Sequence, residues 1–270
     1  MLGKLIKYEY KATGRVFLPL YAVLVLYTLL GRLVMNLEPV QQAFGGMIGG
    51  LMLILYVCLI VAVLVVTVVM AIQRFYKNLL GDEGYLSHTL PVSTNGLVTS
   101  KLLVAISWMV VSVALVAASL LLLVGGVEIF ADLRVSLANL SSQLDQVGIA
   151  PWAFWAELAA NLLVQLVANF LMFYAAMSIG QLFRQKVAGS FLAYLGLNMA
   201  SQTLLVVGLM VLAALNLPYL RELFAEPSNQ FPPAGMWHGM MLGTLVYNAL
   251  LGAACFVASK SLLKRKLNLE

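Results

Sequence analysis

Long, uninterrupted apolar stretches alternate with short polar segments along the whole of this chain. A helix needs about 20 apolar residues to cross the hydrocarbon core of a bilayer. Six stretches reach that length: Val16–Asn36, Met47–Ile72, Leu102–Val124, Trp152–Ile179, Val187–Leu215 and Trp237–Ala258. Strands of a transmembrane barrel would instead alternate apolar and polar residues. The pattern therefore predicts an all-α polytopic membrane protein with six transmembrane helices.

The amino-acid composition indicates the same class of protein. Of the 270 residues, 62% are hydrophobic and 10% are charged, and the mean hydropathy is +0.96. A soluble domain carries about 25% charged residues, so this chain could not cover itself with polar surface in water. We expect a single transmembrane domain over residues 1–270, surrounded by the lipid bilayer.

Lysine and arginine residues concentrate on one side of this predicted topology. Thirteen of the sixteen lie there: Lys4, Lys7, Lys11, Arg15, Arg74, Lys77, Lys101, Arg184, Lys186, Lys260, Lys264, Arg265 and Lys266. Seven of the eleven acids lie on or near the other side. Because cytoplasmic loops carry the excess of bases, both termini are predicted to be cytoplasmic. Attraction of these bases to anionic lipid explains the net charge of +5, so nucleic acid is not an expected partner.

Residues 1–15 have the pattern of an amphipathic helix lying in the inner leaflet. Their bases recur at three- and four-residue spacing and form one stripe, and an apolar stripe of Leu2, Leu5, Ile6 and Tyr10 runs beside it. The alternative is a frayed basic N-terminus.

On the opposite side of the membrane, residues 127–150 predict a helix with one apolar face, which Pro151 would end. That face consists of Phe130, Leu133, Leu137, Leu140, Leu144 and Val147.

Several predicted spans contain polar side chains, which are costly in hydrocarbon and therefore candidates for function. The fourth span has four at intervals of four residues: Glu157, Asn161, Gln165 and Asn169. The fifth span adds Asn198 and Gln202. These residues are candidates to line a substrate path, and the alternative is that they form hydrogen bonds that hold the helices together. Glu157 lies near the outer end of its span, and the sequence suggests no partner for it.

Motifs that would indicate catalysis in this chain are missing from the sequence. It contains no GxxxxGK[ST] loop, no HExxH or CxxC motif and no GxSxG motif. His88 and His238 fall on opposite sides of the membrane in this topology, so they could not share a metal ion. We therefore predict no catalytic residue, no metal site and no cofactor in the chain itself.

The cytoplasmic segment 78–96 is the exception to the apolar pattern. Gly81 is expected to break the long second helix, and Asp82 and Glu83 suit the positive end of a short new helix. Pro91 is expected to end that helix. Its exposed side would carry acids, a tyrosine and leucines, which favours docking into a groove of a soluble partner.

Here the sequence resembles the permease subunits of ABC type-2 exporters. The resemblance is carried by Arg74-Phe75, Gly84-Tyr85-Leu86, Thr89-Leu90-Pro91-Val92-Ser93 and Ser100-Lys101, and by the N-terminal KYEYKATGR segment. It implies a coupling helix that docks on a separate ATPase subunit, which would bind ATP and Mg²⁺. The coupling residues would be Asp82, Glu83, Tyr85, Leu86, Thr89, Leu90 and Pro91.

The resemblance also implies the function and the partners. The chain would pair with a second permease chain, as a homodimer or heterodimer, in a bacterial cytoplasmic membrane. It would export an amphipathic substrate such as a peptide, lipid or drug, and it would not itself be an enzyme. The alternatives from the residues alone are a membrane-embedded enzyme that uses Glu157, and a stand-alone channel or scaffold.

Overall fold

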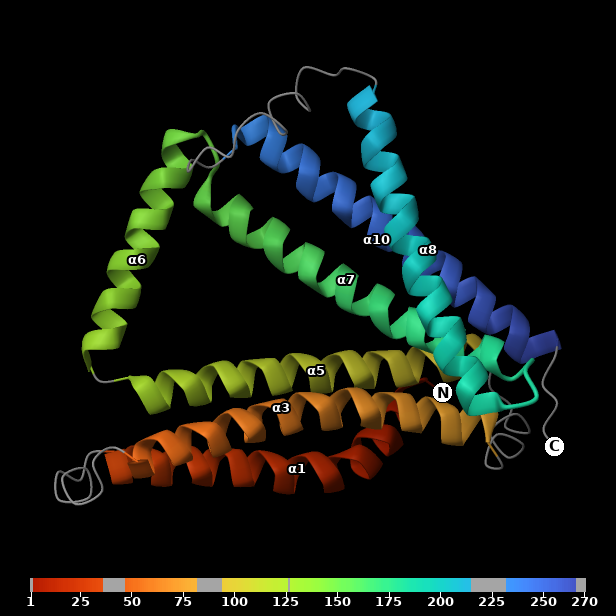
Figure 1. Cartoon of the computed structure of the whole chain (residues 1–270), viewed down its shortest axis with the longest axis horizontal. Helices are drawn as coiled ribbons and strands as arrows, with labels where there is room; N and C mark the ends of the chain where they lie inside the picture. Colours follow the sequence, from red (N-terminus) through yellow and green to blue (C-terminus); the bar gives the residue numbers. More distant parts are fainter. Residues whose placement is uncertain (1, 36–46, 82–93, 126, 215–231, 266–270) are drawn as a thin grey trace. The chain divides into compact units, whose positions relative to one another are not determined.

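A computed structural model describes residues 2–35, 47–81, 94–125, 127–214 and 232–265. All regular secondary structure within these residues is helical, and six of the helices are long and apolar enough to cross a membrane (Figure 1). The prediction of an all-α protein with six spans is confirmed. The predicted coupling helix falls in residues 82–93, which lie outside the described residues.

The chain forms two compact units, Met1–Leu79 with Tyr85–Val135, and Leu80–Gly84 with Ser136–Glu270. The first unit contains α1 (Leu2–Met35), α3 (Met47–Phe75) and α5 (Thr94–Val124), which lie side by side (Figure 1). α1 and α5 run parallel and α3 runs antiparallel to both. Whether the two units act as the single transmembrane domain predicted from the sequence stays a prediction.

Aromatic and hydroxyl side chains form the interior of the first unit. Its buried apolar core consists of Phe17, Tyr21, Leu24, Tyr56, Val63 and Val116. Ser112 Oγ on α5 lies 2.7 Å from Tyr21 Oη on α1 and 2.8 Å from Thr67 Oγ1 on α3. One hydroxyl thus joins three helices, and each buried oxygen has a hydrogen-bond partner, as an apolar interior requires.

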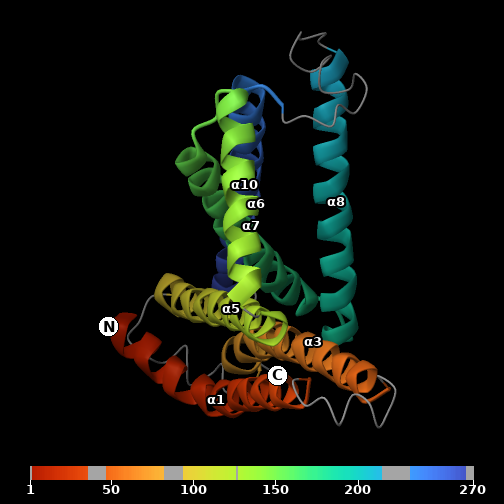
Figure 2. The ribbon, with the colours of Figure 1, turned by 90° about the vertical axis from the view of Figure 1, so that its left-hand side faces the viewer.

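The basic N-terminal segment forms the first part of α1. α1 is continuous from Leu2 to Met35, with Pro19 inside it, and Figure 2 shows that it is bent. A proline inside a helix removes one backbone hydrogen bond and bends the axis. The four bases of the segment are exposed, as expected for a cationic stripe: Lys4, Lys7, Lys11 and Arg15.

α3 is followed directly by η1 (Tyr76–Leu80), one turn of wider π-helix. A bend at Gly81 comes next, so the prediction that this glycine breaks the second helix is confirmed. α5 starts at Thr94. The segment with the coupling motif therefore connects η1 to α5 along the chain.

The second unit contains α7 (Pro151–Gly180), α8 (Lys186–Ala214) and α10 (Ala234–Arg265). α7 and α10 run parallel, and Gly252 on α10 lies against Ala168 on α7. α8 runs antiparallel to both. Phe173 on α7 stacks on Tyr194 of α8 with ring centres 4.5 Å apart. The phenolic oxygen of Tyr247 on α10 donates to Ser201 O on α8 at 2.6 Å.

The predicted outer helix is α6 (Val127–Gln146), but it does not end as predicted. Gly148 has a φ of 79°, and Ile149 N donates to Leu144 O at 2.9 Å. These are the features of a glycine C-cap of the Schellman type. Pro151 instead begins α7, where its missing N–H costs no hydrogen bond. Leu144 and Ile149 are fully buried beside Phe154.

Candidate functional site

Two groups of polar side chains stand out among the described residues, and the first lies in unit 1 at its basic end. Lys101 Nζ on α5 lies 2.5 Å from Glu9 Oε1 on α1. The two side chains are 6% and 15% exposed, respectively. Asn78 Nδ2, in η1, donates to the same carboxylate oxygen at 3.5 Å. Opposite charges in an apolar interior are tolerated when they pair in this way.

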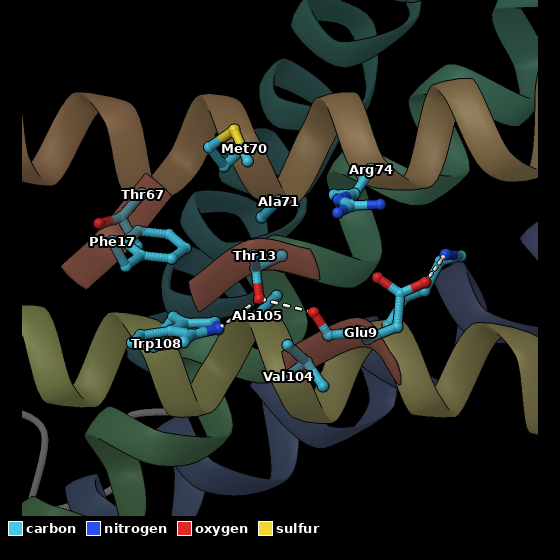
Figure 3. A pocket seen from close by; sticks show the side chains of 11 residues that line it. Glu9, Thr13, Phe17, Thr67, Met70, Ala71, Arg74, Val104, Ala105 and Trp108 are labelled. Carbon is cyan, nitrogen blue, oxygen red and sulfur yellow. Dashed lines mark hydrogen bonds and ion pairs between the residues drawn. The ribbon is translucent and has the colours of Figure 1, made fainter. Parts of the chain in front are cut away.

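A cavity lies beside this ion pair and joins the three helices (Figure 3). Trp108 Nε1 on α5 donates to Thr13 Oγ1 on α1 at 2.8 Å, and Thr13 Oγ1 donates to Glu9 O at 2.8 Å. The Trp108 ring stacks on Phe17 with centres 4.5 Å apart. Figure 3 shows Arg74 of α3 among the side chains that line the cavity.

The size of this cavity limits its role. Its volume is about 20 Å³, which is room for about one water molecule. It cannot hold an amphipathic substrate. The cluster around Glu9 therefore holds α1, η1 and α5 together next to the segment with the coupling motif.

The second group lies in unit 2, between α7 and α10. Glu157 Oε1 on α7 is 2.6 Å from His238 Nδ1 on α10. One turn further along, Asn161 Nδ2 donates to Glu157 O at 3.0 Å and to Met241 O at 3.1 Å. Its Oδ1 accepts a hydrogen bond from Thr244 Oγ1 at 2.8 Å. The polar side chains of α7 thus bind to the facing turns of α10.

An open hollow of about 480 Å³ adjoins these residues. Its polar lining consists of Glu157, Asn161 and His238, and the rest of its lining is apolar: Ala156, Ala160, Gly239, Met241, Leu242 and Leu245. Glu157 and His238 are 30% and 40% exposed, so both reach the hollow. Glu157 Oε2 has no hydrogen-bond partner among the described residues.

The structure separates the polar stripe that the sequence suggested on α7. Glu157 and Asn161 contact α10, whereas Gln165 and Asn169 are exposed. The physical reason is the helical period of 3.6 residues, because four-residue steps drift around the axis by about 40° each. Sequence spacing alone therefore overestimated how far one face extends. Whether any of these residues lines a substrate path stays a prediction.

The two polar residues predicted on α8 bind each other. Gln202 Nε2 donates to Asn198 Oδ1 at 2.6 Å, one turn apart on the same helix. Neither makes a side-chain hydrogen bond to the Glu157 group in the described structure. The seven predicted coupling residues lie outside the described residues: Asp82, Glu83, Tyr85, Leu86, Thr89, Leu90 and Pro91.

The sequence did not identify His238 and Glu9 as partners in these groups. His238 was considered only as a possible metal ligand, and Glu9 was not singled out. A signal for the first pair existed, because Glu157 and His238 both lie close to the N-terminal ends of the predicted spans that begin at Trp152 and Trp237. For Glu9, the signal was a single acid within the basic segment 1–15, on a face other than that of the basic stripe.

Within the residues that the structure describes, no group of three or more His, Cys, Asp or Glu side chains could hold a metal ion.

No protein-family model matches this chain, and no curated protein or solved structure matches it. The fold and composition define a multi-pass helical membrane protein.

Proposed function

We propose that this chain is the permease subunit of an ATP-driven exporter, powered by a separate ATPase subunit. The observation that carries the proposal is the Glu9–Lys101 ion pair. Glu9 belongs to the KYEYKATGR segment and Lys101 closes the loop motif, so the two segments that carry the family resemblance meet in space.

The contacts around this pair suggest how force would pass into the membrane. The segment 78–96 would dock on the ATPase, and its first residue, Asn78, binds Glu9. Lys101 lies just beyond its other end and binds the same carboxylate. A movement of the docked segment would therefore act on α1, α3 and α5 together, because all three are joined at its base.

The remaining parts of the proposal follow from the family mechanism. Two permease chains would pair, each with its own ATPase, and closure of the ATPases on ATP and Mg²⁺ would tilt or rotate the spans. An amphipathic substrate would move along the polar side chains of α7 and α8 toward the outer side. The basic ends of the helices, which carry Lys4, Arg74 and Lys260, would face the bacterial cytoplasm.

Affinity purification of the chain in mild detergent tests this proposal directly. The wild-type chain is expected to co-elute with an ATPase that carries a GxxxxGK[ST] loop. Leu90→Asp should abolish the association, because it places a charge on the predicted docking face. Leu133→Asp on α6 is the matched control, since Leu133 is exposed and predicted to lie on the outer side, and it should retain the ATPase. The proposal fails if the wild-type chain elutes without an ATPase, or if Leu90→Asp binds it normally.

A membrane-embedded enzyme is the second candidate, and the Glu157–His238 pair is the observation that favours it. A carboxylate bound to an imidazole can act as a general base. Among the described residues that line the hollow, none is a serine, threonine or cysteine, so the pair would have to activate water. Hydrolysis of lipid or peptide substrates by the purified chain without nucleotide would support this candidate.

A further inference from the structure

We propose that the hollow between α7 and α10 binds amphipathic cations, and that Glu157 is the residue that recognises their positive charge. This inference rests on the proposed function, because it names the class of substrate that the exporter would carry. The evidence for it is three features of the hollow: its size, its apolar lining and the carboxylate of Glu157.

The size and the lining suit a small amphipathic molecule. The hollow measures about 480 Å³, which falls within the range of about 300–1,000 Å³ typical of sites for such ligands. Six of its nine lining residues are alanine, glycine, leucine or methionine. These side chains would contact the hydrocarbon or aromatic part of a ligand and would offer no polar partner to it.

Among the polar groups that line the hollow, the Glu157 carboxylate is the one that could attract a cationic ligand. Asn161 uses both its amide nitrogen and its oxygen in hydrogen bonds to α7 and α10. The Glu157 carboxylate binds His238 through Oε1, and Oε2 is buried with no hydrogen-bond partner among the described residues. The Glu157 side chain as a whole is 30% exposed and lines the hollow, so its negative charge can attract a positively charged group there.

No protein cation compensates Glu157 within the described part of unit 2, apart from His238 when it is protonated. The bases of this unit whose side chains the structure describes lie toward the opposite ends of the helices: Arg184, Lys186 and Lys260. A carboxylate beside an apolar surface attracts a cation more strongly than one surrounded by water. With its proton on Nδ1, a neutral His238 would hold the carboxylate in place without cancelling its charge.

The test measures binding of radiolabelled tetraphenylphosphonium to the full-length chain in lipid nanodiscs, without ATPase or nucleotide. Tetraphenylborate is the control ligand, because it has nearly the same size and shape and the opposite charge. We expect saturable binding of tetraphenylphosphonium that tetraphenylborate does not displace. Glu157→Gln should weaken it at least tenfold, while Asp145→Asn, which removes an exposed charge from the same unit, should leave it unchanged.

His238→Arg provides a second, independent variant. It places a permanent cation beside Glu157, so it should weaken tetraphenylphosphonium binding about as much as Glu157→Gln does. Gel-filtration profiles and melting curves check that each variant is folded. Absence of saturable binding to the wild-type chain, equal binding by Glu157→Gln, or equal binding of tetraphenylborate would each overturn the inference.

The two proposals can fail separately. The binding assay contains no ATPase, so a cation site found in a chain that elutes without an ATPase would overturn the proposed function and leave the site standing. Conversely, an ATPase that co-elutes with a chain unable to bind tetraphenylphosphonium would support the exporter and refute the cation site.

Discussion

Glu9 on α1 and Lys101 on α5 form an ion pair with a nitrogen–oxygen distance of 2.5 Å, across 92 positions of the chain. Both side chains are largely buried, and Asn78 adds a third contact from η1. Charged groups withdrawn from water are costly unless they are paired, so the pair constrains how the three helices can meet.

Lys101→Met is expected to destabilise the protein strongly, because it leaves the Glu9 carboxylate buried without its partner. Loss of one member of a buried pair costs about 3–5 kcal/mol. Glu9→Met should have a similar effect, while the double variant Glu9→Met with Lys101→Met should be less destabilised than the sum of the two. Thermal unfolding of the purified variants in one detergent measures this. Strictly additive losses would show that the two charges do not interact.

Asn161→Leu is expected to destabilise the packing of α7 against α10, because it removes the hydrogen bonds to Met241 O and from Thr244. Hydrogen bonds between membrane helices contribute about 0.6 kcal/mol each on average, so the loss should be about 1 kcal/mol. Gln165→Leu is the matched control on the same helix, since Gln165 is exposed.

Unfolding in detergent by stepwise addition of a denaturant compares these two variants. Gln165→Leu should match the wild-type chain. A larger loss for Gln165→Leu than for Asn161→Leu would contradict the assignment of Asn161 to the helix interface.

Gly148→Ala is expected to lower stability by about 1–2 kcal/mol, because a left-handed backbone is strained for any residue with a Cβ atom. Space is not the obstacle, since a Cβ added at Gly148 would lie 3.8 Å from Ala234 Cβ, an ordinary contact. Gly235→Ala is the control: a Cβ there would meet nothing within 4 Å, and alanine favours the helix.

Melting temperatures of the two glycine variants, measured side by side, provide the check. Gly148→Ala should melt below the wild-type chain and Gly235→Ala at or slightly above it. Equal melting of the two would mean that the C-cap of α6 contributes nothing to stability.

The sequence by itself determined the class of the protein and the number of its spans. Span length depends only on how many consecutive residues are apolar, which is a property of the chain in one dimension. The break of the second helix at Gly81 was predictable for a similar reason, because a glycine weakens the helix locally. The end of α6 was not predictable from the sequence, since both Gly148 and Pro151 can end a helix. The burial of Leu144 and Ile149 in one cluster favours the end at Gly148.

Only the tertiary structure decided which polar groups meet. Glu157 finds His238 across 81 positions, and Glu9 finds Lys101 across 92. Such pairs depend on which helices are neighbours and how each is rotated about its axis, and hydrophobicity specifies neither. The same rotation turns Asn161 toward α10 and leaves Asn169 exposed. A membrane helix is apolar on nearly all sides, so its sequence contains little information about which side its partner covers.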